Sequence, residues 1–197
     1  MKKNLIRLSC LLLLAFASCK SCKKDVEPSP ESKLPPATQT GANTAGCLIN
    51  GVAWIPNGTG GFMGSGPISA IGGVQDKFII ISFNRNFYDN TVQGDAVEKI
   101  TLCINNYKTL GERLLNFDTE IYPNSLSPQN YGYYSVRASG AYENRYVTTS
   151  MVVGKATITQ FHQLRSDGPT SGTFEFDAID PVTNKIISIK NGRFDIK

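Results

Sequence analysis

The feature that most constrains the fold is a series of short segments in which apolar and polar side chains alternate. Residues 173–179 alternate aromatic or small side chains with acidic ones, and related segments follow at 186–189 and 193–196, the last after Asn191-Gly192. A period of two places each set of side chains on one face of a strand. The pattern therefore predicts a three-stranded meander with turns between the strands, whose phenylalanines point into the core. These are Phe174, Phe176 and Phe194.

The same reasoning predicts strands upstream. Asn50-Gly51 lies between two short apolar runs and is a strong hairpin signal, because a type I′ turn needs positive φ at both central residues. Further strand-like runs span 78–83, 97–104, 131–138 and 152–164. No segment shows a helical period with caps, and residues 110–115 would supply one short turn at most.

These segments together predict an all-β domain. We expect an antiparallel β-sandwich of about 8–10 short strands joined by turns rich in Gly, Asn and Pro. A closed or partly open β-barrel is the alternative, because barrels are built from the same kind of strand. We prefer the sandwich because the strands are short and unevenly spaced along the chain.

Residues 1–18 have the pattern of an export signal. A positively charged start is followed by an apolar stretch of about 11 residues and by small residues directly before Cys19. That stretch is too short to cross a bilayer core of about 30 Å as a helix. The segment is similar to a bacterial lipoprotein signal, in which a peptidase cuts before a cysteine that is then acylated, although Phe16 stands where Leu, Val or Ile is usual. An ordinary cleaved signal and a retained anchor are the alternatives, and attachment at Cys22 is disfavoured by the charge of Lys20.

Between Cys19 and the domain we expect a flexible stalk. Residues 19–41 contain prolines among charged and polar residues and show no apolar period, a composition that favours extended, solvated backbone. The alternative is that residues 34–40 lie on the domain as an extra strand. The length of the remainder, residues 42–197, is that of a single domain.

Charge and motifs exclude several classes of function. The chain has 20 Lys+Arg and 16 Asp+Glu, and three of those cations lie in the signal, so the mature protein is close to neutral. It contains no run of five like charges, which argues against a nucleic-acid partner. The glycine-rich segment 57–67 lacks the spacing of a phosphate-binding loop, and Asp89, Asn90 and Asp95 lack the pattern of a calcium loop. We predict no metal and no cofactor.

Two cysteines, Cys47 and Cys103, fall in the predicted domain. An exported domain permits a disulfide between them, which would contribute about 4 kcal/mol on the chain-entropy model. The alternative is that both are small buried hydrophobic residues, because free cysteine packs well. The sequence leaves both interpretations open.

The residues that could carry catalysis do not form a convincing constellation. His162 is the only histidine, and Ser166 and Asp167 are too close along the chain to converge on it in a proton-transfer geometry. Glu175 and Asp177 share one strand face at a spacing near that of glycosidase carboxylates. Alternation with phenylalanines already explains them as the solvated face of a half-buried strand. We predict that the chain is not an enzyme.

All eight tyrosines fall between Tyr88 and Tyr146, with Tyr131, Tyr133 and Tyr134 close together. Tyrosine offers flat, amphipathic area that stacks on sugars or packs in protein interfaces. On a strand, Tyr131 and Tyr133 would share a face and Tyr134 would take the other. Tyrosine also simply favours strands. If a ligand surface exists, we expect it around these three residues.

Motifs at both ends of the predicted domain resemble a known family. The opening contains Leu-Pro-Pro at 34–36, Gln-Thr-Gly at 39–41 and Cys-Leu-Ile-Asn-Gly at 47–51. The ending contains Gly-Thr-Phe-Glu-Phe at 172–176 and Asn-Gly-Arg-Phe-Asp at 191–195. In these pieces the chain resembles a family of small Bacteroidota lipoproteins of unknown function. The resemblance implies an envelope location and an all-β fold, and it carries over no catalytic residues.

The function that the sequence favours is a non-enzymatic binding domain tethered by lipid to the bacterial outer membrane, periplasmic or surface-exposed. Its expected ligand is a carbohydrate, a peptide or a protein. A structural envelope component without a small ligand and a carboxylate-dependent hydrolase are the alternatives.

Overall fold

The computed structural model describes residues 28–57, 66–72, 77–89, 94–117, 129–138, 143–161 and 169–197. In these ranges the chain forms eleven strands and one short 3-10 helix, η1 (Pro30–Lys33). The strands are β1 (Thr44–Ile49), β2 (Val52–Trp54), β3 (Ile68–Gly72), β4 (Phe78–Asp89), β5 (Gly94–Asn105), β6 (Gly111–Leu115), β7 (Tyr131–Ala138), β8 (Asn144–Val147), β9 (Gly154–Gln160), β10 (Thr170–Ile179) and β11 (Ile186–Ile196). The predicted all-β, antiparallel fold is confirmed. The described residues contain no helix that is long and apolar enough to span a bilayer.

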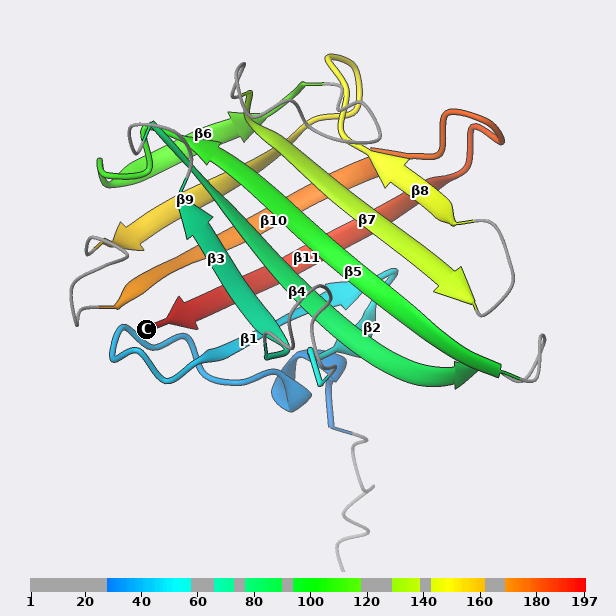
Figure 1. Cartoon of the computed structure of the whole chain (residues 1–197), viewed down its shortest axis with the longest axis horizontal. Helices are drawn as coiled ribbons and strands as arrows, with labels where there is room; N and C mark the ends of the chain where they lie inside the picture. Colours follow the sequence, from blue (N-terminus) through cyan, green and yellow to red (C-terminus); the bar gives the residue numbers. More distant parts are fainter. Residues whose placement is uncertain are drawn as a thin grey trace, which may run out of the picture.

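All of these strands belong to one sheet that folds over itself into two layers. Its order is β2-β1-β11-β10-β8-β7-β5-β4-β3, with β9 pairing with β10 and β6 with β9. Figure 1 shows β3, β4, β5 and β7 crossing in front of β1, β9, β10 and β11; we call these the front and rear layers. The layers connect at the end of β10, where Ile179 pairs with Val147 of β8. The sheet does not close into a barrel.

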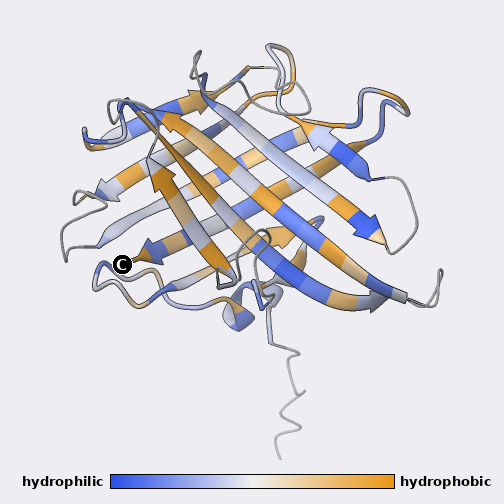
Figure 2. Ribbon diagram, in the orientation of Figure 1, coloured by the Kyte–Doolittle hydropathy of each residue, from blue (hydrophilic) through white to orange (hydrophobic). Residues whose placement is uncertain are grey.

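The core lies between the two layers and is built from the alternating apolar residues. The three predicted phenylalanines, Phe174, Phe176 and Phe194, are all buried in it. Phe83 of β4 stacks on Phe174, with ring centroids 5.6 Å apart and planes 10° from parallel, and it lies 6.3 Å from Phe194. Figure 2 shows apolar and polar residues alternating along the strands of both layers. The aromatic cluster thus joins the front layer to the rear layer.

One predicted turn is confirmed and another is wrong. Asn50 and Gly51 have φ of 48° and 80°, as the hairpin signal requires. Asn191 also has a positive φ, of 53°, but β11 continues through it and the expected third strand of the meander is part of β11. The register between β10 and β11 shifts near this point, so Asn191-Gly192 forms a bulge instead of a hairpin.

The chain that precedes β1 lies against the rear layer. Leu34 is buried, the Nη1 group of Arg193 donates to the Pro35 carbonyl at 3.4 Å, and Arg193 Nη2 lies 3.3 Å from Glu31 Oε1. Among the described residues, chain within the predicted stalk of residues 19–41 thus contacts the sheet, at Glu31, Leu34 and Pro35. Residues 34–40 do lie on the domain, but as irregular chain and not as the extra strand considered as the alternative.

Candidate functional site

A groove of about 450 Å³ lies on the outer face of the rear layer, between the sheet and the chain that precedes β1. The preceding chain contributes Glu31 and Ala37. The strands contribute Lys155 and Thr157 of β9, Thr173, Phe174 and Glu175 of β10, and Asn191, Gly192 and Arg193 of β11. The groove therefore has a floor of β-sheet and one wall made by the N-terminal segment.

The floor is polar because it is the solvent-facing side of strands along which polar and apolar residues alternate. Thr173 pairs in register with Thr157 on one side and with Arg193 on the other, so these three side chains form a row across β9, β10 and β11. Phe174 points to the opposite face and is only 3% exposed. The floor thus presents hydroxyl groups, with no exposed aromatic ring in it.

Charges of both signs stand at the rim of the groove. Lys155 Nζ lies 3.4 Å from Glu112 Oε2 and 3.5 Å from Glu175 Oε1, and the charge of Glu112, followed by that of Glu175, raises the pKa of Lys155. Their side chains are 42–53% exposed. Exposed pairs of this kind contribute little to stability. These groups can therefore exchange their present partners for those of a ligand at small cost.

Asp195 fixes the wall of the groove. Its side chain faces away from the core, and the residue is only 1% exposed. The carboxylate accepts hydrogen bonds from the hydroxyls of Thr38 and Ser171 at 2.6 and 2.7 Å. It also accepts from the backbone N–H groups of Gly41, Thr40 and Ala42 at 2.9, 3.0 and 3.1 Å. Burial alone would raise the pKa of Asp195, but the hydrogen bonds, first from Thr38 and Ser171, outweigh it and hold the pKa far below its usual value.

Neither this wall nor its anchor was identified from the sequence. The expectation from the sequence that relates to the wall is the alternative in which residues 34–40 lie on the domain. Asp195 lies between two apolar residues near the end of β11, and this pattern alone predicts a side chain on the solvated face of a strand. Its partners lie up to 157 residues away along the chain, and no local pattern reveals such a pairing.

The tyrosines of β7 alternate as predicted, and for that reason they do not form one ligand surface. Tyr131 and Tyr133 lie on the outer face of the front layer, whereas Tyr134 packs in the core. Tyr131 is 3% exposed, so its ring is not available for stacking. The hydroxyl of Tyr133 donates to Glu143 Oε1 at 3.2 Å, and that of Tyr134 donates to Glu98 Oε1 at 2.8 Å.

The carboxylates considered for catalysis are engaged in pairs across neighbouring strands. Glu175 faces Lys155, and Asp177 Oδ1 lies 3.1 Å from Lys190 Nζ. This placement agrees with the solvated strand face expected from alternation. Among the described residues, no three His, Cys, Asp or Glu side chains gather as metal ligands. Cys19, Asn90, His162, Ser166 and Asp167 lie outside the described residues.

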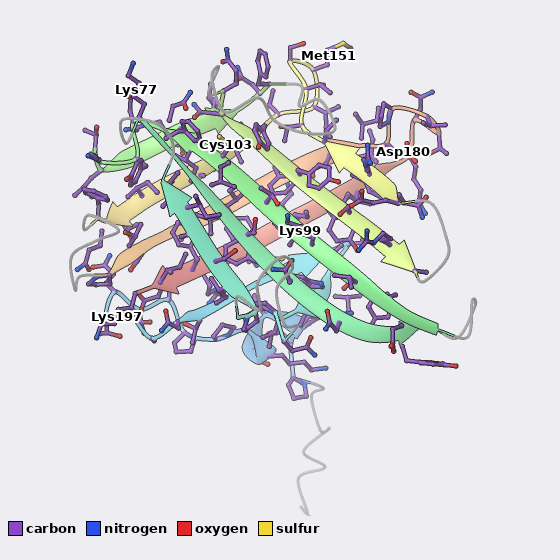
Figure 3. The ribbon with its side chains drawn as sticks, in the orientation of Figure 1. Lys77, Lys99, Cys103, Met151, Asp180 and Lys197 are labelled. Carbon is purple, nitrogen blue, oxygen red and sulfur yellow. The ribbon has the colours of Figure 1, made fainter. Side chains whose placement is uncertain are left out.

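Cys47 and Cys103 are free and buried in separate clusters, so the structure holds no disulfide between them. Cys47 of β1 lies in the core opposite Trp54. Cys103 packs with Phe78 and Tyr131 on the outer face of the front layer, towards one end of β5 (Figure 3). Burial raises the pKa of both thiols, that of Cys103 to about 12. The structure therefore agrees with the alternative in which Cys47 and Cys103 are two small buried hydrophobic residues.

Comparisons with known proteins gave no match: no family model, no curated protein and no solved structure matches this chain. What the groove can bind therefore has to be inferred from its own chemistry.

Proposed function

We propose that this protein is a non-enzymatic binding domain, tethered to the bacterial outer membrane through lipid on Cys19, whose groove binds a polar stretch of polypeptide. The observation that carries the proposal is the groove of about 450 Å³, which combines a floor of hydroxyl groups with a rim of both charges. Concave sites with a few placed polar groups are the usual form of ligand sites.

A peptide suits the lining better than a carbohydrate does. Sugars stack on exposed aromatic faces, and Phe174, the aromatic residue of the lining, is turned into the core. A peptide offers N–H and C=O groups to Thr157, Thr173 and Asn191, together with side chains of either charge for the rim. Binding is therefore supported by polar complementarity and not by stacking.

The arrangement of the rim favours binding over hydrolysis. Glu175 and Glu31 each lie beside a cation, at 3.5 Å from Lys155 and 3.3 Å from Arg193. Both carboxylates therefore face charged side chains of the rim, as partners for the charges of a ligand, and do not form a pair that flanks a scissile bond.

The length of chain between Cys19 and the wall limits how far the groove would lie from the membrane. Glu31 follows Cys19 by twelve positions, and an extended chain covers at most about 3.5 Å per residue. A lipid on Cys19 would therefore hold the groove within about 40 Å of the bilayer surface. The expected ligands are peptides or protein segments at the envelope.

Blocking the floor is expected to abolish peptide binding. Peptides would first be selected from a displayed random library with the mature full-length protein in detergent. Thr173→Tyr should weaken binding of the selected peptides at least about tenfold, because the larger side chain fills the floor and moves the hydroxyl away from its present position. Isothermal titration calorimetry measures the change.

Thr159→Tyr is the matched control for this test. Thr159 is an exposed residue of β9, two positions from Thr157, and it does not line the groove. Peptides that bind both variants like the unaltered protein, or a library that yields no binder, would contradict the proposal. A glycan-array signal that is lost in Thr173→Tyr alone would replace the peptide by a carbohydrate.

Removing the lipidated cysteine is expected to release the protein from the membrane. Cys19→Ala should shift the protein from the membrane fraction to the soluble fraction, because two or three acyl chains anchor stably and none would remain. Fractionation of expressing cells, followed by mass spectrometry of the N-terminal peptide, measures both location and lipid. Retention of Cys19→Ala in the membrane fraction would contradict attachment at this residue.

A further inference from the structure

A second cluster of polar groups lies between the layers and shares no residue with the groove. It centres on Glu98 of β5, whose side chain is 13% exposed. The indole N–H of Trp54 donates to Glu98 Oε2 at 2.6 Å, and the Tyr134 hydroxyl donates to Oε1 at 2.8 Å. Arg85 Nε lies 2.8 Å from Oε2. Burial, followed by the charge of Glu98, raises the pKa of Tyr134 and keeps its hydroxyl a donor.

The register of the front layer brings these charges together. Arg85 and Glu98 are directly opposite each other on β4 and β5. Along β4, Arg85 continues the core-facing series that includes Ile81 and Phe83, and Glu98 likewise precedes Ile100 on β5. The two charges therefore extend the core face of the front layer beyond its apolar part.

The guanidinium of Arg85 is held on three sides. Its Nε atom is beside Glu98, and its Cζ atom lies 6.0 Å from the centroid of the Trp54 ring and 5.8 Å from that of Phe87. Within the described part of the chain, no acceptor hydrogen-bonds to its Nη1 or Nη2. The side chain is 30% exposed. The result is an oriented guanidinium edge, beside two aromatic rings, with donors left for another partner.

We propose that Arg85 binds the carboxylate of a small monoanionic ligand through its Nη1 and Nη2 groups, with the apolar part of the ligand against the partly exposed ring of Phe87. A guanidinium edge matches the two oxygens of a carboxylate in a bidentate pair. The partly exposed ring of Phe87 provides contact area for an apolar substituent, whereas the Trp54 ring is only 2% exposed and contacts Arg85 from the core. The site is separate from the peptide-binding groove.

The charge of the cluster favours a carboxylate over a phosphate. Glu98 already neutralises Arg85, so the pair carries no net positive charge to attract a dianion. A second anion at the Nη edge also meets repulsion from Glu98, and that repulsion grows with the charge of the ligand. A single carboxylate with an apolar substituent has the smallest repulsion and the largest ring contact.

Trp54 provides the signal for the test, because it is the only tryptophan in the chain and contacts the cluster directly. The mature full-length protein would be titrated with phenylacetate, with neutral phenylacetamide and with inorganic phosphate, by tryptophan fluorescence and calorimetry. We expect phenylacetate to bind and to change the fluorescence, and both other compounds to bind at least about tenfold more weakly.

Variants of Arg85 connect the binding to the proposed donors. Arg85→Gln should weaken phenylacetate binding about tenfold or more. Arg85→Lys should weaken it less, because lysine keeps the positive charge although it lacks the guanidinium edge. Arg137→Gln removes the same charge from an exposed position on β7 and should leave binding unchanged. Peptide binding in the groove should persist in Arg85→Gln, which separates failure of this site from failure of the groove.

Several results would overturn the proposal. These are an absence of phenylacetate binding, equal binding of phenylacetamide, and equal binding by Arg85→Gln. Phosphate binding tighter than phenylacetate binding would overturn the choice of carboxylate. Should the Arg85 variants fail to fold, NMR of the guanidinium nitrogens in the unaltered protein decides: phenylacetate must shift the Arg85 Nη resonances, and unchanged resonances reject the site.

Discussion

Asp195→Asn is expected to lower the free energy of unfolding by about 3 kcal/mol, measured by urea denaturation at neutral pH. The carboxylate accepts from two hydroxyls and three backbone N–H groups at 2.6–3.1 Å. An asparagine keeps one oxygen and points an NH₂ group at donors that bond the second carboxylate oxygen in the unaltered protein. Those donors then remain buried and unsatisfied, which is costly.

The effect of Asp195→Asn should depend on pH. Because hydrogen bonds lower the pKa of Asp195 in the folded state, its stabilisation is fully present above the unfolded-state pKa of about 3.9 and is lost as the pH falls towards the folded-state value. The difference between the unaltered protein and the variant should therefore shrink between about pH 5 and pH 2.

Asp177→Asn is the matched control for Asp195→Asn. Asp177 is a half-exposed carboxylate of β10 that pairs with Lys190, so its replacement should change the stability by less than about 0.5 kcal/mol. A loss in Asp195→Asn no larger than in this control, or one that is constant with pH, would contradict the anchoring role of the carboxylate.

Phe174→Ala is expected to cost about 4 kcal/mol of unfolding free energy, the range for truncating a buried phenylalanine. Its ring stacks on Phe83 of the front layer at 5.6 Å and lies 6.4 and 6.5 Å from Phe176 and Phe194. The truncation removes the stacked contact with Phe83, one of the contacts that join the layers, and leaves a cavity. Equilibrium denaturation, with the midpoint and slope fitted separately, measures the loss.

Phe117→Ala is the control for Phe174→Ala, because Phe117 is 45% exposed and its truncation should cost less than about 1 kcal/mol. Phe174→Leu should fall between the two, since a leucine fills much of the cavity. Equal losses in Phe174→Ala and Phe117→Ala would mean that the aromatic cluster does not join the layers.

Local sequence pattern predicted those parts of the fold in which neighbouring residues decide the conformation. The alternation of residues 173–179 became β10, and Asn50-Gly51 became a turn with two positive φ angles. Asn191-Gly192 carries the same dipeptide but lies within β11, where pairing with β10 and β1 continues on both sides. Residues 110–115, considered for a helical turn, contain the strand β6 because β9 pairs with them.

The two candidate sites differ in how far the sequence could reveal them. Arg85 and Glu98 occupy positions that alternation assigns to the core faces of two strands. A charged residue at such a position can be recognised from the sequence alone. The groove has no such signal, since its floor looks like any solvated strand face. Its wall depends on residues 28–42 meeting β11, and that contact exists only in the folded molecule.

The bond between Thr38 and Asp195 also sets an order of events during biogenesis. Its two ends are 157 positions apart, so residues 38–42 have no carboxylate to dock on until the last strand of the chain has been synthesised. Contacts of such long range form late and slowly. A chain clipped before Asp195 would therefore keep residues 38–42 without the acceptor that holds them against the sheet, and the wall of the groove would lose its anchor.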